Sequence, residues 1–173
     1  MAASIGGWLG AVPLFPIVLG AGVLFTVLLA SRVAARLDLP VWVVVGLGLS
    51  LSLIAAATLS PAANRIAGSC LRSMVAPVDP RDLIGRSDRV LNTWLFVPLG
   101  FFAGFLAVRR VWVLVLAFCV PLFVEGIQRY AQVLGRRCQF QDLVDNTWGL
   151  ILGALVGVVV GLVAQRTGSV RRS

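Results

Sequence analysis

The side chains that could carry chemistry form a short inventory. The 173-residue chain has seven acids and fifteen bases; all fifteen bases are Arg, and His is absent. Without His or Lys, the sequence excludes histidine general bases, histidine metal sites, Ser-His-Asp triads and Schiff-base lysines. Cys70, Cys119 and Cys138 lack metal-ligand spacing. We therefore expect no metal and no cofactor, and acid–base chemistry would have to come from a few carboxylates.

Three of the seven acids stand close together in the sequence. Asp38, Asp79, Asp82 and Asp88 fall in predicted loops, where water can solvate them. The other three are Glu125, Asp142 and Asp145. Three arginines stand among them: Arg129, Arg136 and Arg137. This stretch is therefore the first place to look for a site.

The composition indicates that the elements carrying these residues lie in a membrane. Hydrophobic residues make up 59% of the chain and charged residues 13%, and the mean hydropathy is +0.96. A soluble domain is about 25% charged. The formal net charge of +8 does not indicate a nucleic-acid partner, because the arginines fall between apolar runs, as in the loops of a membrane protein. We expect membrane lipids as partners and no nucleic acid.

Apolar runs predict an all-α transmembrane bundle in a single domain spanning residues 1–173. The runs are 8–30, 40–59, 90–108, 111–124 and 143–164. A bilayer core needs about 20 helical residues, and four of the runs are long enough. The run 111–124 spans only if its helix continues through Glu125 and Arg129 to about residue 134. We favour five helices over four. The first run lacks a preceding base, which a signal peptide would have, so it is expected to be a retained helix.

Five spans would bring the unusual polar residues to one membrane face. The loops 60–89 and 135–142 then lie on the same side, at the start of the third and fifth spans and the end of the fourth. The candidate ligand-binding residues at this face are Asn92, Glu125, Gln128, Arg136, Asp142 and Asn146. The arginine turn 109–110 and the arginines of the C-terminal tail favour an inside C-terminus and an outside N-terminus. Cys70 and Cys138 would share the outer face, either paired or free.

Each candidate also has a structural interpretation. Glu125 is either a functional carboxylate or a clasp neutralised by Arg129 or Arg136. Asp142 and Asp145 could cap the last helix and complement its dipole. A stripe of glycines recurs every four residues on that helix: Gly149, Gly153, Gly157 and Gly161. Such a stripe is typical of close helix packing, within the chain or in a homo-oligomer.

Several short strings resemble the VanZ-like family of small bacterial membrane proteins. They run from Asn92 to Gly100, from Glu125 to Gln128, through Gly135-Arg136, and from Asp142 to Gly149, within about residues 59–157. The resemblance implies a multi-pass protein of the bacterial cell membrane, and members are associated with low-level resistance to the glycopeptide teicoplanin. It implies no mechanism. The family usually has a further acid before Asp142, which this chain lacks, so a mechanism that needs that acid is in doubt.

Three functions fit these residues, and the sequence leaves open whether the protein is an enzyme. The first is binding of a lipid or cell-wall-precursor headgroup, with Arg136 and Arg137 holding phosphate and the other candidates shaping the pocket. The second is an intramembrane enzyme with Glu125 or Asp142 as general base. The third is a small transporter in which Glu125 carries a proton.

Overall fold

A computed structural model describes residues 12–61, 77, 79, 88–135 and 139–168, and these ranges are predominantly helical. Its five long helices are α2 (Phe15–Leu37), α3 (Val41–Leu59), α4 (Asp88–Ala107), α5 (Val111–Tyr130) and α6 (Phe140–Arg166). A 3₁₀ turn, η2 (Gln132–Leu134), follows α5. The predicted all-α class is confirmed.

All five helices are long and apolar enough to cross a membrane. At 1.5 Å per residue, even the shortest of them approaches the ~30 Å thickness of a bilayer core. Helix α5 continues through Glu125 and Gln128 to Tyr130. The described part of the chain thus has five helices that could span a membrane, the number that the sequence analysis favours.

Three helix boundaries differ from the sequence prediction. Helix α2 begins at Phe15, after the non-helical residues 12–14, and not at residue 8. Helix α2 runs through Arg32 and Arg36 to Leu37, so the predicted loop 31–39 shortens to a tight turn. Asp38, with φ of 50° in the left-handed region, ends the helix. Helix α6 begins at Phe140, before its apolar run. Polar residues at the headgroup level continue both helices without adding to the apolar signal.

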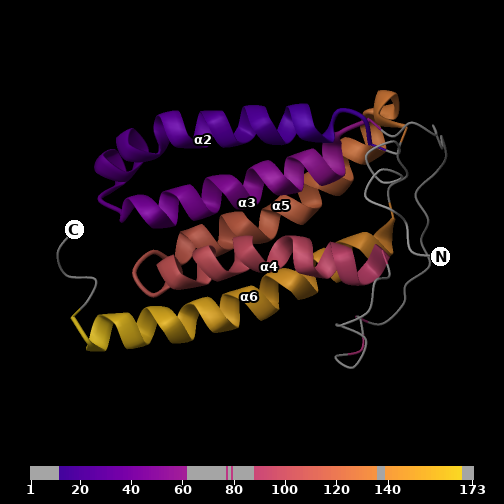
Figure 1. The fold of residues 1–173 in the computed structure, drawn as a ribbon. Helices are drawn as coiled ribbons and strands as arrows, with labels where there is room; N and C mark the ends of the chain where they lie inside the picture. The colour runs from indigo at the N-terminus through magenta and orange to yellow at the C-terminus, as the bar shows by residue number, and fades with distance from the viewer. Residues whose placement is uncertain (1–11, 62–76, 78, 80–87, 136–138, 169–173) are drawn as a thin grey trace.

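The helices form a bundle in which α4 lies at the centre (Figure 1). Helix α2 packs against α3 on one side, and α6 packs against α4 on the other. Because α4 and α6 are separated by one antiparallel helix, they run parallel, and they form the most extensive helix pair of the bundle. The largest buried side chains of the main core are Ile54, Phe96 and Leu150.

Glycines set the distance between α4 and α6. An added Cβ at Gly149, Gly153 or Gly157 would overlap a backbone carbonyl oxygen of α4. Gly100 and Gly104 of α4 make the reciprocal contact with the backbone of α6. The predicted stripe thus packs against α4 of the same chain. It is not free to pair with a second copy, so a homo-oligomer would need another surface.

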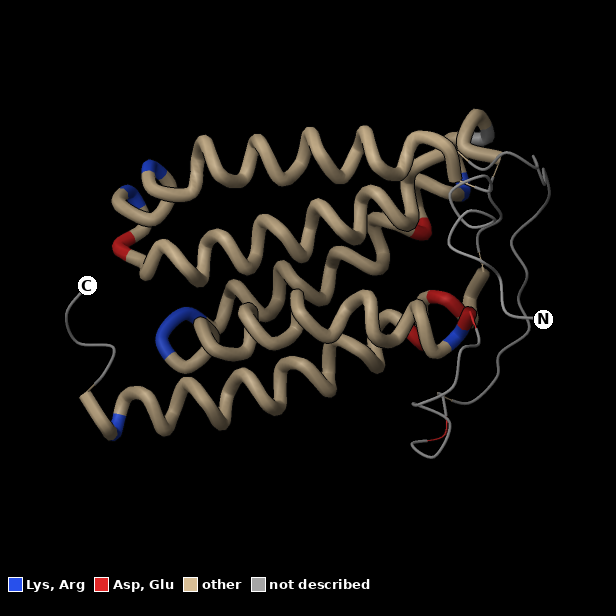
Figure 2. The backbone as a smooth tube through the Cα atoms, viewed as in Figure 1, with Lys and Arg blue, Asp and Glu red and all other residues tan. Residues whose placement is uncertain are grey.

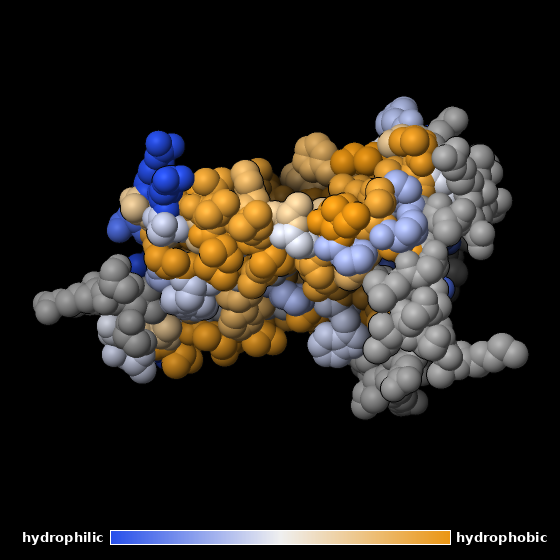
Figure 3. Space-filling model, turned by 45° about the horizontal axis from the view of Figure 1, so that its top comes forward, coloured by the Kyte–Doolittle hydropathy of each residue, from blue (hydrophilic) through white to orange (hydrophobic). Residues whose placement is uncertain are grey.

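The outer surface of the bundle is apolar between two polar ends. Space-filling spheres show hydrophobic side chains along the length of the helices and hydrophilic ones near the ends (Figure 3). Trp42 and Trp112 are half-exposed near the starts of α3 and α5, and Trp94 is half-exposed near the start of α4, at the other end. Tryptophans at this depth anchor a helix at the membrane–water interface. The protein is therefore a membrane protein.

Candidate functional site

The starts of α4 and α6 meet the end of α5 at one end of the bundle (Figure 2). We call the polar side chains gathered there the polar layer. Its members are Arg89, Asn92, Glu125, Gln128, Asp142, Asp145 and Asn146. The topological prediction that the third, fourth and fifth spans bring their polar residues to one face agrees with this arrangement.

The most direct contact between predicted site residues joins α4 and α6. Nδ2 of Asn92 donates a hydrogen bond to Oδ1 of Asp142 at 2.9 Å. Both side chains are short, so the contact requires the close approach of the two helices that the glycines allow. Asp142 lies in the first turn of α6, where a carboxylate also complements the helix dipole.

An ion pair that the sequence did not predict lies beside this contact. Nε and Nη2 of Arg89 donate to the two carboxylate oxygens of Asp145, each at 3.1 Å. Nε2 of Gln141 donates a third hydrogen bond to Oδ1 of Asp145 at 2.9 Å. Asp145 is fully buried, whereas the Arg89 side chain is 37% exposed. A bidentate, charge-assisted pair of this kind fixes both position and orientation. Asp145 therefore serves the α4–α6 contact rather than a helix cap.

Glu125 is buried in the polar layer, and of its two predicted arginine partners the described one, Arg129, does not pair with it. Its Oε2 accepts a hydrogen bond from the backbone N–H of Gln139 at 3.0 Å. Arg129, one turn further along α5, is exposed and forms no ion pair with Glu125. The clasp with Arg129 is thus wrong, and Arg136 lies outside the described residues. The contact links the end of α5 to the residue that precedes α6.

Two buried side-chain amides each have one atom without a partner. Nε2 of Gln128 donates to the backbone oxygen of Thr58 at 2.9 Å, which ties α5 to the end of α3. Oε1 of Gln128 and Oδ1 of Asn146 are buried and have no hydrogen-bond partner in the described part of the chain. Nε1 of Trp148 is likewise buried and unpartnered. Buried polar atoms are normally hydrogen-bonded, so these three atoms require an explanation.

The structure thus brings together most of the predicted site, and it adds residues that the sequence did not single out. Asn92, Asp142, Glu125 and Gln128 make the contacts described above, and Asn146 follows Asp142 by one turn on α6. Arg136 lies outside the described residues, as do Cys70 and Cys138. The added residues are Arg89, Gln139, Gln141 and Trp148. Arg89 had one available signal: it precedes Asn92 by three residues, which places both on one helix face.

The chemistry of the described layer is that of an acceptor-rich site. Its charged groups are three carboxylates and one arginine. Its unpartnered atoms are the amide oxygens of Gln128 and Asn146, and the unpartnered indole N–H of Trp148 belongs to the same helix as Asn146, α6. Among the described residues no group of His, Cys, Asp and Glu could hold a metal ion. Such a set suits a ligand that presents hydroxyl, amine or amide donors.

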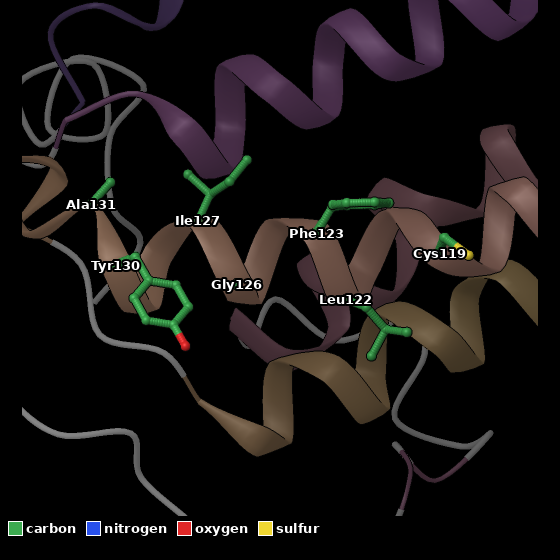
Figure 4. A pocket seen from close by; sticks show the side chains of 7 residues that line it. All are labelled: Cys119, Leu122, Phe123, Gly126, Ile127, Tyr130 and Ala131. Carbon is green, nitrogen blue, oxygen red and sulfur yellow. The ribbon is translucent and has the colours of Figure 1, made fainter.

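An apolar hollow lies elsewhere, on the outer side of α5 (Figure 4). Phe123 and Ile127 border it on one side and Leu122 and Tyr130 on the other, with Gly126 between them. Helical spacing places this groove on the opposite side of α5 from Glu125 and Gln128. It is a bilayer-facing surface and not part of the polar layer.

Comparison with known proteins gives one result. A family model described as VanZ/LLP1 matches residues 17–161, which covers most of the chain and all of the polar layer. No curated protein matches the chain, and no solved structure does.

Proposed function

The chain belongs to the VanZ/LLP1 family, and from this premise we propose that it is a multi-pass protein of the bacterial cell membrane whose polar layer binds the headgroup of an envelope lipid or cell-wall precursor. The observation that supports this proposal is the pair of unpartnered amide oxygens on Gln128 and Asn146. Their side chains are 7% and 2% exposed. Leaving such an acceptor buried and unpaired costs about 1–3 kcal/mol, which a ligand donor would recover.

The chemistry of the unpartnered atoms favours binding over catalysis. Side-chain amides and an indole neither take up nor release protons, so they hold and orient a ligand. The two carboxylates considered as general bases are engaged instead with Asn92 and with the backbone of Gln139. The described contacts therefore favour neither the enzyme nor the proton transporter.

The acceptor-rich layer narrows the class of headgroup. Carboxylates and amide oxygens accept hydrogen bonds from sugar hydroxyls, sugar amides or an ethanolamine ammonium, and carboxylates repel phosphate. Any phosphate of the ligand would then have to contact arginines, for which the sequence predicts Arg136 and Arg137. A polyprenyl-pyrophosphate-linked sugar meets both requirements. A protein that holds such a headgroup would reduce the access of teicoplanin to its target, which would account for the resistance that the resemblance suggests.

The proposal predicts that removing the unpartnered amide oxygen of Asn146 weakens lipid binding without lowering the stability of the protein. We expect Asn146→Leu to leave the thermal stability of the detergent-purified protein unchanged or higher, because an unpaired buried amide is lost. We also expect this variant to lose retention of a polyprenyl-pyrophosphate-linked disaccharide in native mass spectrometry. Ser31→Leu, an exposed polar residue at the other end of the bundle, is the control and should retain the lipid.

Two outcomes would contradict the proposal. If Asn146→Leu retains the lipid as well as the unmodified chain does, the amide does not contact a headgroup. If Asn146→Leu loses stability and lipid together, Asn146 is a structural residue. Phosphatidylethanolamine and phosphatidylcholine are measured in parallel, because the first offers an ammonium donor and the second does not.

A further inference from the structure

A hollow with charged residues in its lining lies at the end of the bundle opposite the polar layer. It has a volume of about 240 Å³ and lies between the α2–α3 turn, the α4–α5 turn and α6. That volume equals the share of about eight liquid waters, so it can hold a phosphate with a small polar group attached. Its lining includes Asp38, Phe105, Leu106, Arg109 and Arg110.

The hollow has an apolar side and a cationic side. Phe105 and Leu106 are buried, and they give the hollow an apolar wall. Arg109 and Arg110 lie in the turn between α4 and α5, and Arg109 is exposed. A ligand that is anionic at one point and apolar next to it fits both sides.

Asp38 also lines the hollow, but neither of its two arginines pairs with that carboxylate. Neither takes part in an ion pair in the described part of the chain, where the ion pair is Arg89–Asp145. Arg110 directly precedes the first residue of α5, at the positive end of that helix dipole, with no side-chain cap. An anion bound at this helix end would complement the dipole of α5.

The surroundings of the hollow are also strongly basic. Arg32 and Arg36 near the end of α2 and Arg166 at the end of α6 stand at the same end of the bundle. Figure 2 shows these basic residues with one acid at this end, whereas the described residues of the opposite end include both acids and bases. Asp38 is the one described acid here. The field at the hollow therefore favours an anion.

The depth of the hollow indicates a lipid. Trp42 and Trp112, which begin the adjoining helices, are half-exposed and mark the membrane interface at this end. Val111, immediately after Arg110, is an exposed apolar residue on the bilayer side. Basic pockets between transmembrane helices at headgroup depth bind anionic phospholipids. We propose that this hollow binds the phosphate of an anionic glycerophospholipid, held by Arg109 and Arg110, with its glycerol against Phe105 and Leu106.

This site is separate from the proposed headgroup site in the polar layer, and its test is independent. Native mass spectrometry of the full-length chain in detergent would compare retention of phosphatidylglycerol with that of phosphatidylcholine. We expect the unmodified chain to prefer phosphatidylglycerol. The double variant Arg109→Gln/Arg110→Gln should lose this preference by about tenfold or more, the effect of losing one or two charge-assisted contacts.

Asp38→Asn should change the lipid preference in the opposite direction to the loss of the arginines. Asparagine tolerates the left-handed backbone of this position, so the turn is kept. Removing the one acid of the hollow should strengthen the preference for phosphatidylglycerol. The matched control is Arg32→Gln/Arg36→Gln, which removes the same charge from exposed positions outside the hollow and should change the preference by less than about twofold.

Three outcomes would overturn the assignment. Equal losses in the two arginine double variants would mean that only general surface charge attracts the lipid. Displacement of phosphatidylglycerol by an equal concentration of glycerol 3-phosphate would mean a soluble anion site. No effect of Arg110→Gln alone, which is measured if the double variant does not accumulate, would exclude the hollow.

Discussion

The glycine contact between α4 and α6 predicts a measurable difference between two identical substitutions. A Cβ added at Gly153 would overlap the carbonyl oxygen of Val97 and would lie 2.8 Å from the backbone nitrogen of Phe101. Gly126 on α5 is also helical, and a Cβ there has no heavy atom within 4 Å. Gly153→Ala and Gly126→Ala therefore differ only in the packing that they meet.

The expected difference in the free energy of unfolding between the two variants can be worked out because their gains in helix propensity cancel. Alanine gains up to about 1 kcal/mol over glycine in helix propensity, and both variants share this gain. The difference between them then isolates the cost of overpacking, which is about 1–3 kcal/mol in well-packed cores. We expect the upper half of this range, because the obstructing atoms at Gly153 are backbone and cannot rotate away. Gly126→Ala should be neutral or slightly stabilising.

The assay is reversible unfolding of the purified protein by SDS in mixed micelles, followed by far-ultraviolet circular dichroism. Gly20→Ala is a second control, since its Cβ would also meet nothing within 4 Å. If Gly153→Ala is as stable as these two controls, α4 and α6 are not in backbone contact, and the account of the polar layer built on that contact fails with it.

Two further predictions concern the Arg89–Asp145 ion pair and the orientation of the chain in the membrane. Arg89→Gln should destabilise the protein by about 3 kcal/mol or more, because it leaves a buried carboxylate without its cation. Asp145→Asn should destabilise it less, because the partly exposed Arg89 can reach water, and equal losses of stability in SDS unfolding would contradict this difference. With the native cysteines replaced by serine, a cysteine at Ser31 should react with a membrane-impermeant maleimide only after the membrane is opened, whereas Cys70 restored alone should react in intact cells. The reverse labelling would place the N-terminus inside.

Much of the fold could be predicted because the bilayer restricts the solutions. A spanning segment must satisfy its backbone internally and must be apolar over about 20 residues, and both conditions are visible in the sequence. The same reasoning failed at the ends of α2 and α6. There the helix continues through Arg32, Arg36 and Asp142 at headgroup depth, where polarity no longer indicates a loop.

The residues of the polar layer could be predicted to lie together only where the number and direction of the helices decide it. Counting spans places Asn92 and Asp142 at one face, and the structure joins them by a hydrogen bond. The hydrogen-bond partner of Glu125 could not be predicted by counting spans, because it is the backbone N–H of Gln139, and every residue except proline has such a group. Arg89 was missed because it adjoins a loop rich in arginine, and only the true start of α4 at Asp88 places it on the helix.

The glycine stripe and the polar layer are parts of one helix register. Residues of α4 and α6 that are 56 positions apart face each other, both in the Arg89–Asp145 pair and in the contacts of Gly149 and Gly153 with Thr93 and Val97. A second row, 50 positions apart, holds the Asn92–Asp142 bond and the contact of Gly100 with Leu150. Asparagine and aspartate can bond directly across two helices only where the backbones nearly touch. The glycines below the polar layer therefore determine whether its side chains meet, and a residue with a larger side chain at Gly149, the glycine nearest the layer, would separate them first.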